Sequence, residues 1–216
     1  MDKHCSEMLK LKDIDAIVFD LGGVIIDLDF QRSFDQFSTL SGKSPEAIRQ
    51  GIFDSGLLHH YEKGHYTDDQ FLTEIEKIFT LTCDRSIIEQ AFLALLLYIP
   101  PARIELIRKL SKDYRVFVLS NTSAIHYKEV NAILKRDTGY EHLDHLFEKV
   151  FLSFELGLLK PHQEIYKAVL DQAQLVPQHT LFLDDNADNL IGASSLGIRT
   201  ALVSKEQSIL NLFNHE

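Results

Sequence analysis

The sequence predicts an α/β fold in which a parallel, doubly wound β-sheet is interrupted by one inserted helical segment. Two observations support this class. Short apolar, β-rich runs alternate with longer amphipathic stretches over most of the chain, and repeated strand-then-helix units produce parallel sheets with helices on both faces. Between about residues 31 and 98 the β-rich runs stop, so this stretch is expected to form helices only.

Five strands are expected from runs that are mostly apolar along their whole length, because strands covered on both faces need no polar alternation. In chain order they are Ala16–Phe19, Arg115–Leu119, Lys149–Leu152, Leu181–Leu183 and Thr200–Val203. The long interval between the first two runs places the helical segment between the first and second strands.

Four helices are expected among the later strands from apolar residues spaced three and four apart. They cover Pro101–Leu110, Ser123–Leu134, Pro161–Gln174 and Ala187–Leu196. Pro161 suits the first position of a helix, where no backbone N–H is needed, and Gly197 suits the position after a helix end.

The inserted segment is expected to contain several helices, which glycine- and serine-containing breaks separate. The clearest covers Thr67–Phe79, where Thr67 and Gln70 can form a capping box and the apolar residues form one stripe. We expect two domains: an α/β core made of residues 1–30 and 99–216, and a helical domain of residues 31–98.

The composition argues against several classes of function. A net charge of −10 over 216 residues supplies no basic face for nucleic acid, and two cysteines are too few for a disulfide framework or a zinc site. The longest apolar run, Ala91 to Ile99, is far shorter than the ~20 residues of a membrane helix. Charges in residues 1–7 occupy the place where a signal peptide would need an apolar segment. We therefore expect a cytoplasmic protein that binds neither nucleic acid nor membranes, and the sequence leaves its oligomeric state open.

Asp20 directly follows the first predicted strand and precedes two glycines, Gly22 and Gly23. Ligands of open α/β sheets bind beyond the carboxyl ends of the strands. A carboxylate at this place is a candidate nucleophile that attacks phosphorus and forms an aspartyl-phosphate. A turn aspartate before glycines would produce the same pattern.

Other polar residues follow predicted strands or precede a predicted helix. Ser120 and Asn121 come after the second strand and can bind a phosphoryl group with a hydroxyl and backbone N–H groups, although ordinary helix capping also explains them. Lys160 lies in a loop before a helix, where its ammonium could hold a carboxylate and a phosphate together. Asp184 and Asp185 follow the fourth strand, and adjacent acids repel each other unless a cation such as Mg²⁺ binds between them.

These motifs resemble, in order and spacing, those of the haloacid dehalogenase superfamily of phosphohydrolases. The matching segments are Phe19–Val24, Leu119–Thr122, Leu159–Pro161 and Phe182–Asp185, together with Asn189. The resemblance spans nearly the whole core and implies a Rossmann-like sheet with an inserted C1-type helical cap. The first and last motifs are most similar to those of bacterial sugar-1-phosphate phosphatases and the N-terminal phosphatase domain of epoxide hydrolase.

The resemblance implies a metal site at the end of the first and fourth strands. Asp20 would be the nucleophile and also a ligand of Mg²⁺, with the backbone carbonyl of Gly22 as a second ligand. Asp185 would reach the metal from the fourth strand, and Asp184 would lie beside it. Mg²⁺ is therefore the expected cofactor, and a small phosphate ester the expected partner.

The resemblance also implies how the phosphate is held. Ser120 and the backbone of Asn121 would bind the phosphoryl oxygens, and Lys160 would orient Asp20 and screen negative charge. Positioning and electrostatics of this kind supply most of the catalysis in phosphoryl transfer.

Gly22 departs from the family's pattern, in which most phosphatases carry an aspartate that protonates the leaving oxygen and later activates water. General acid–base catalysis contributes roughly 10²–10⁴-fold. Three explanations stay open: a cap residue supplies the proton, the leaving group needs no acid, or the protein is not a fast phosphatase. Sugar 1-phosphates suit the second explanation, because an anomeric oxygen leaves readily.

Polar and aromatic side chains gather around Gly64 in the inserted segment. Tyr61, Glu62 and Lys63 are therefore candidates for substrate specificity, since a loop of this kind can close over a site. An exposed connection between two helices would show the same composition.

Our leading hypothesis is Mg²⁺-dependent hydrolysis of small phosphorylated metabolites, such as a hexose 1-phosphate, through an aspartyl-phosphate at Asp20. A metal-independent 2-haloacid dehalogenase is the enzymatic rival, because a halide leaves without an acid. A catalytically weak protein that senses a ligand with the same phosphate site is the second rival.

Overall fold

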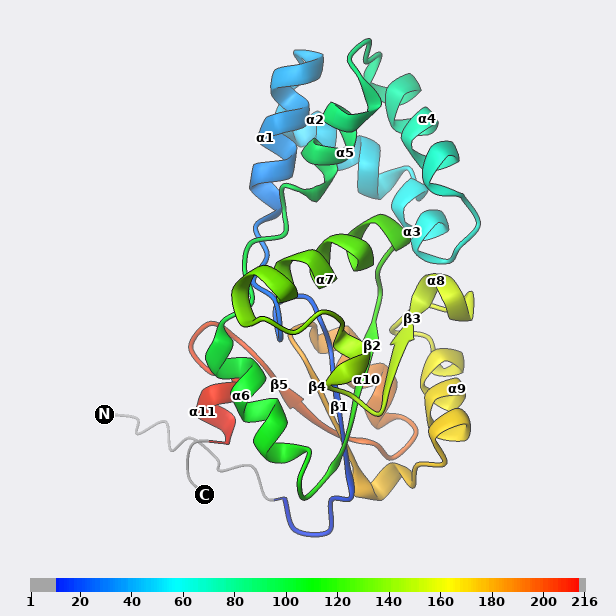
Figure 1. Cartoon of the computed structure of the whole chain (residues 1–216). Coiled ribbons are helices and arrows are strands. Elements are labelled where there is room, and N and C mark those ends of the chain that lie inside the picture. The colour runs from blue at the N-terminus through cyan, green and yellow to red at the C-terminus, as the bar shows by residue number, and fades with distance from the viewer. Residues whose placement is uncertain (1–10, 214–216) are drawn as a thin grey trace, which may run out of the picture.

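The structure, a computed structural model, describes residues 11–213. Residues 1–7, with the charges that argue against a signal peptide, lie outside the described residues, as do both outer ends of the predicted core domain. The described chain contains one parallel sheet with helices on both faces and a separate group of helices beyond one end of it (Figure 1). The predicted class, a doubly wound α/β sheet with an inserted helical segment, is confirmed.

The sheet has the strand order β3-β2-β1-β4-β5. Its strands are β1 (Ala16–Phe19), β2 (Arg115–Ser120), β3 (Lys149–Leu152), β4 (Thr180–Asp184) and β5 (Arg199–Leu202). From β1 the chain builds outwards to β3 on one side and then crosses to β4 on the other, so the direction of strand order reverses at β1. Such a reversal opens a crevice at the carboxyl ends of the strands, where α/β proteins bind ligands.

Helices of the core cover the two faces of this sheet. They are α6 (Pro101–Leu110), α7 (Ala124–Thr138), η2 (Leu143–His145), α8 (Ser153–Leu156), α9 (Gln163–Ala173), η3 (Pro177–His179), α10 (Ala187–Ser194) and α11 (Ile209–Leu212). Among residues 11–213, none of the helices has both the length and the apolar character needed to cross a membrane.

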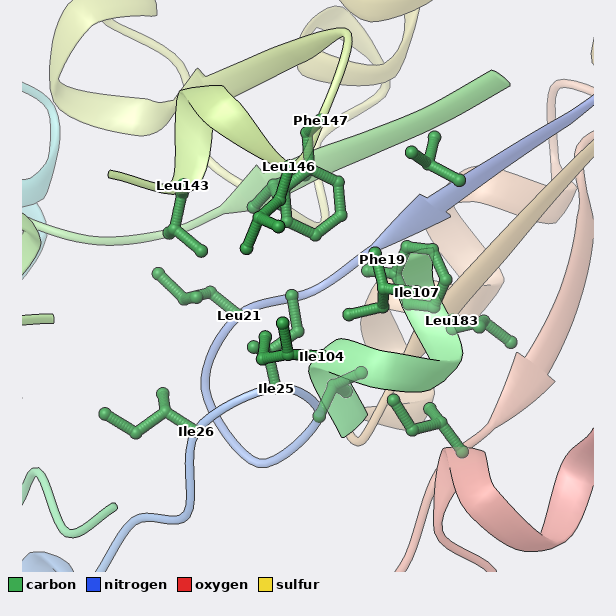
Figure 2. Close-up of a cluster of buried hydrophobic side chains, with 14 of the residues drawn as sticks. Phe19, Leu21, Ile25, Ile26, Ile104, Ile107, Leu143, Leu146, Phe147 and Leu183 are labelled. Atoms are coloured by element: carbon green, nitrogen blue, oxygen red, sulfur yellow. The ribbon is translucent and has the colours of Figure 1, made fainter. Parts of the chain in front are cut away.

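The loop after β1 is fixed in place by its own apolar side chains. Leu21, Ile25 and Ile26 are almost fully buried, and Figure 2 shows them among side chains of α6 and the segment that precedes β3. The backbone N–H groups of Ile25 and Ile26 both donate to the carbonyl of Leu21, at 2.9 and 3.0 Å. These contacts fix the course of the loop where it leaves the sheet at Asp20.

The helical insertion, as we call α1 to α5, lies between β1 and β2 and has its own hydrophobic core. Its helices are α1 (Phe30–Ser41), α2 (Pro45–Arg49), the π-helical η1 (Gln50–Asp54), α3 (Leu57–Glu62), α4 (Asp68–Phe79) and α5 (Arg85–Leu93). The capping box predicted for Thr67 and Gln70 is present at the start of α4. The domain limits at residues 30 and 98 stay a prediction.

Three of the four helices predicted among the later strands have different limits in the structure, and α10 ends at Ser194 instead of Leu196. Helix α7 continues to Thr138 and ends at Gly139, which adopts a left-handed conformation. Helix α9 begins at Gln163 and not at Pro161, because the side chain of Asn121 binds both backbone polar groups of Lys160 and holds this stretch as a loop. The prediction that Pro161 opens the helix is wrong, since tertiary hydrogen bonds determine the start.

Candidate active site

Lys160 lies at the centre of a buried ionic cluster at the carboxyl edge of the sheet. Its Nζ lies 2.8 Å from Oδ1 of Asp20 and 2.7 Å from Oδ2 of Asp184. Burial opposes the charge of Lys160, but the two carboxylates outweigh this effect and raise its pKa. Parallel pairing explains why Asp20 and Asp184 lie close together. Phe19 of β1 lies beside Leu183 of β4, and an aspartate follows each of these residues.

Asn121 positions the backbone that carries Lys160. Its Nδ2 donates to the carbonyl of Lys160 at 3.0 Å, and its Oδ1 accepts from the N–H of the same residue at 2.9 Å. The ammonium also donates to the carbonyl of Leu119 at 3.2 Å. The side chain of Asn121 is therefore engaged with the loop, which leaves its backbone for the phosphate contact that the sequence predicts.

The two carboxylate oxygens of Asp20 differ in their hydrogen bonds. Its Oδ1 accepts from Lys160 and, at 2.6 Å, from the backbone N–H of Leu21. No residue that the structure describes donates a hydrogen bond to Oδ2. Burial raises the pKa of this carboxyl, Lys160 partly offsets that effect, and the charge of Asp184 adds to it. The held oxygen fixes the plane of the carboxylate, so Oδ2 is available to an electrophile.

Asp184 and Asp185 are adjacent in the sequence and differ in environment. Asp184 is fully buried and accepts hydrogen bonds from Lys160, from the backbone N–H of Asn186 at 2.8 Å and from Nδ2 of Asn189 at 3.0 Å. Asp185 is exposed. The carboxylate of Asp184 is thus committed to the protein, whereas that of Asp185 remains accessible to a ligand.

The cluster fits a divalent cation. Ligand oxygens of Asp20, Asp184 and Asp185 lie within 4.8 Å of one another, and Lys160 provides one positive charge for three carboxylates. Burial and the charge of Asp184 raise the pKa of Asp185 as well, and the three carboxylates outnumber the single ammonium among them. Mg²⁺ would balance the excess negative charge, and carboxylate oxygens without thiol or imidazole ligands are the donors that Mg²⁺ prefers.

A cavity of about 90 Å³ lies between the sheet edge and the helical insertion. Its polar lining includes the predicted phosphate ligands Ser120 and Asn121, together with Thr122 and Glu62, and the backbone of Gly22 also borders it. Most other lining residues are apolar and come from the insertion and its connections: Leu28, Phe30, Phe34, Ile52, Phe53, Leu58, Phe92, Leu95 and Leu96. A phosphoryl group beside Ser120 would thus face an apolar chamber.

The three predicted specificity residues occupy different places. Glu62 lines the cavity. Tyr61 instead packs inside the insertion, where its ring stacks on Phe71 with centroids 4.0 Å apart and its hydroxyl donates to Asp68 at 2.6 Å. Lys63 is half-buried and lies outside the cavity lining. Of the three, Glu62 alone lines this cavity.

Two residues that shape the site are not among those that the sequence predicts. Ser153 exchanges hydrogen bonds of 2.9 and 3.0 Å with the backbone N–H and carbonyl of Thr122, which fixes the loop that follows β2. Its position directly after β3 was the available signal, because the other site residues also follow strands. Leu28 covers Gly22: a Cβ atom on that glycine would lie 2.7 Å from Leu28 Cδ1. No local sequence pattern indicates this contact.

Comparisons with known proteins identify the family of the chain. The model of the haloacid dehalogenase-like hydrolases matches residues 14–197. The chain is 27% identical over 187 residues to D-ribitol-5-phosphate phosphatase of Bacteroides thetaiotaomicron, which covers 87% of this chain and 90% of that protein. It is also 40% identical over 70 residues to bifunctional epoxide hydrolase 2 of Rattus norvegicus, a match that spans 32% of this chain and 12% of that one.

A solved structure extends the likeness to three dimensions. A haloacid dehalogenase family enzyme of Bacteroides thetaiotaomicron, crystallised with magnesium and inorganic phosphate, superimposes with a TM-score of 0.84 and 32% identity. The match covers 93% of this chain and 99% of that one. Agreement in sequence and in fold over nearly the whole length confirms the predicted resemblance: the chain belongs to the haloacid dehalogenase-like hydrolases.

Proposed function

We propose that the chain is a Mg²⁺-dependent phosphoric monoester hydrolase that works through an aspartyl-phosphate at Asp20. The observation that carries the proposal is the cluster of Asp20, Asp184 and Asp185 around Lys160, beside a cavity that Ser120 lines. Phosphoryl transfer depends mainly on positioning and charge stabilisation, and this arrangement supplies both. The phosphatase relative and the magnesium- and phosphate-bound neighbour support the same activity.

In this mechanism Oδ2 of Asp20 attacks the phosphorus atom while Oδ1 stays bound to Lys160 and the N–H of Leu21. Ser120 and the backbone of Asn121 hold the phosphoryl oxygens. Asp185, Asp20 and the carbonyl of Gly22 would hold Mg²⁺, with Asp184 fixing Lys160. Bound there, the cation would offset the electrostatic repulsion between the carboxylate nucleophile and the phosphate dianion.

A polyol or sugar phosphate is the first candidate substrate. The likeness to D-ribitol-5-phosphate phosphatase along nearly the whole chain supports it. A hexose 1-phosphate would also suit a site without an aspartate at Gly22, because its leaving oxygen needs less protonation.

A phosphate ester with an apolar organic group is the second candidate. The chamber beyond the phosphate site is lined mostly by leucine, isoleucine and phenylalanine side chains. Sugar hydroxyls placed there would lose hydrogen bonds to water without gaining partners, at a cost of about 1–3 kcal/mol for each unpaired group.

The test is phosphate release from a panel that contains ribitol 5-phosphate, hexose 1-phosphates and farnesyl monophosphate, each with Mg²⁺ and with a chelator. We expect turnover with Mg²⁺ and none with the chelator. Asp20→Asn should reduce kcat by roughly 10⁴-fold or more, since a nucleophile is lost, while circular dichroism remains that of the parent.

Three results would contradict the proposal. Full metal-dependent phosphate release by Asp20→Asn would exclude this residue as nucleophile. Release of halide from 2-haloacids in the presence of a chelator would favour the dehalogenase. Tight binding of a phosphate ester without turnover would favour a ligand-sensing protein.

A further inference from the structure

Within the described part of the core, the acidic residues nearest in sequence to Gly22 are not available as an acid for the leaving group. Leu28 fills the space in which a side chain on Gly22 would begin. The two aspartates that follow are engaged elsewhere: Asp27 forms an ion pair of 2.7 Å with Arg103, and Asp29 caps α1. The proton for the leaving oxygen must therefore come from another part of the chain or from water.

Glu62 reaches the same cavity from the opposite side. It is the last residue of α3 in the helical insertion and lines the cavity together with Gly22 and Ser120. Its carboxyl group lies outside the cluster of candidate metal ligands. No described residue donates a hydrogen bond to this carboxyl, so it is not committed to a structural partner.

The surroundings of Glu62 suit proton transfer. Burial raises its pKa, the charge of Lys160 lowers it and the charge of Asp20 raises it again, to about 7. Both the protonated and the ionised form are therefore accessible near neutral pH, which is the condition for efficient acid–base catalysis. His126 also lines the cavity, but burial lowers its pKa to about 4. Asp68 of the adjoining α4 is bound by Tyr61.

We propose that Glu62 is the general acid and then the general base of the reaction, in the place of the aspartate that is absent at Gly22. The assignment rests on the proposed phosphatase function. In the first step Asp20 attacks phosphorus, the bond from phosphorus to the ester oxygen breaks, and the Glu62 carboxyl gives its proton to that oxygen, so that an alcohol leaves. In the second step Glu62 carboxylate takes a proton from water, the oxygen of that water attacks phosphorus, and the bond to Asp20 breaks. Phosphate is released, and Glu62 is protonated again.

The experiment compares Glu62→Gln with the wild-type chain on two esters that differ in leaving group, with Mg²⁺ present. Glycerol 2-phosphate has an alkoxide leaving group that needs a proton, whereas p-nitrophenolate leaves from p-nitrophenyl phosphate without one. Glu74→Gln is the matched control, because it makes the same change on α4 and removes only a surface ion pair with Lys77.

With glycerol 2-phosphate, Glu62→Gln should lose about 10²-fold or more in kcat/KM. With p-nitrophenyl phosphate the first step should stay fast and the second should slow, because no base activates water. A burst of one nitrophenolate per active site should then precede a slow steady state in stopped-flow traces. In the wild-type chain kcat/KM for glycerol 2-phosphate should fall as the pH rises and the Glu62 carboxyl ionises, and this fall should be absent from Glu62→Gln.

The outcomes separate the two proposals. If the wild-type chain turns over both esters and Glu62→Gln behaves like Glu74→Gln, the role of Glu62 is overturned and the phosphatase function stands. An equal loss on both esters without a burst would assign Glu62 to substrate binding and also overturn the role. If the wild-type chain hydrolyses neither ester with Mg²⁺, both proposals fail.

Discussion

Asn121 shows how one polar side chain can hold the backbone of a buried lysine in place. Sequence position suggests a helix cap or a phosphate ligand, but its amide binds the N–H and the carbonyl of Lys160 as a pair. The lysine lies 39 residues away in the sequence and is almost completely buried. The ammonium can bridge Asp20 and Asp184 only while its backbone stays at this place.

We expect Asn121→Ala to reduce kcat/KM for phosphate release by about 10²-fold, because displacement of a catalytic group by about 1 Å has effects of this size. The free energy of unfolding should fall by about 1–3 kcal/mol, since backbone groups of Lys160 lose their partners. Steady-state kinetics and urea unfolding measure the two effects.

Asn131→Ala is the control for this change. Asn131 also makes two hydrogen bonds to backbone, with the carbonyl of Tyr127 and the N–H of Leu143, on the far part of α7. It should lose comparable stability and keep its activity. Equal kinetic losses in both variants would show that Asn121 acts through stability alone.

The segment that follows helix α3 makes a close backbone contact with the core. Gly64, two residues after the helix, has a φ of +72°, and a Cβ atom there would collide with the carbonyl oxygen of Phe154 in α8. Only glycine permits both the left-handed conformation and this approach. The contact brings Glu62 of the insertion to the same cavity as Ser120 of the core.

Gly64→Ala should therefore lift α3 from α8 and reduce turnover of glycerol 2-phosphate by about tenfold or more. Gly42→Ala is the matched variant, because Gly42 has a φ of +70° and a Cβ atom added to it would meet no other atom within 4 Å. Both substitutions should cost about 1–2 kcal/mol for the left-handed conformation, as urea unfolding would show. Loss of activity in both, or in neither, would contradict this role of Gly64.

Across the whole molecule, an aromatic stack joins the helical insertion to the core. His126 of α7 lies on Phe92 of α5 with ring centroids 4.1 Å apart, and its Nε2 lies 3.4 Å from the carbonyl of the same residue. Burial lowers the pKa of His126 to about 4, although the contact with the Phe92 carbonyl acts in the opposite direction. The ring is thus neutral in the folded protein at neutral pH.

The contribution of His126 to stability should decrease as the pH falls from about 6.5 to about 4. In the unfolded chain a histidine binds a proton below about pH 6.5, whereas His126 in the folded chain does so only near pH 4. At this site the unfolded state therefore holds more protons in this interval, and the contribution of His126 to the free energy of unfolding should fall by up to about 3 kcal/mol across it.

Urea unfolding at several pH values between 7 and 4 measures this contribution. His126→Phe should retain the stack and show a shallower dependence on pH, whereas replacement of the exposed His59 by Gln should leave the dependence as it is. Identical slopes for His126→Phe and the parent chain would exclude His126 as the source.

Much of the core could be predicted because its information is local. All five strands and the order of the polar residues that follow them can be read from short runs, and parallel pairing then places Asp20, Ser120 and Asp184 at one edge. The ends of a helix could not be predicted where hydrogen bonds from residues distant in the sequence determine them. The start of α9, two residues after Pro161, is an example.

The amino-acid sequence was sufficient to predict the sheet and the family, because strand-forming runs and strand-end motifs depend on neighbouring residues, and it named candidates for holding a phosphate and a metal. Three features emerged only from the folded chain: Asn121 holds Lys160, Leu28 fills the space at Gly22, and Glu62 rather than Tyr61 faces the cavity. These contacts join residues that are distant in the chain, and packing of the insertion against the sheet edge determines which side chains meet there.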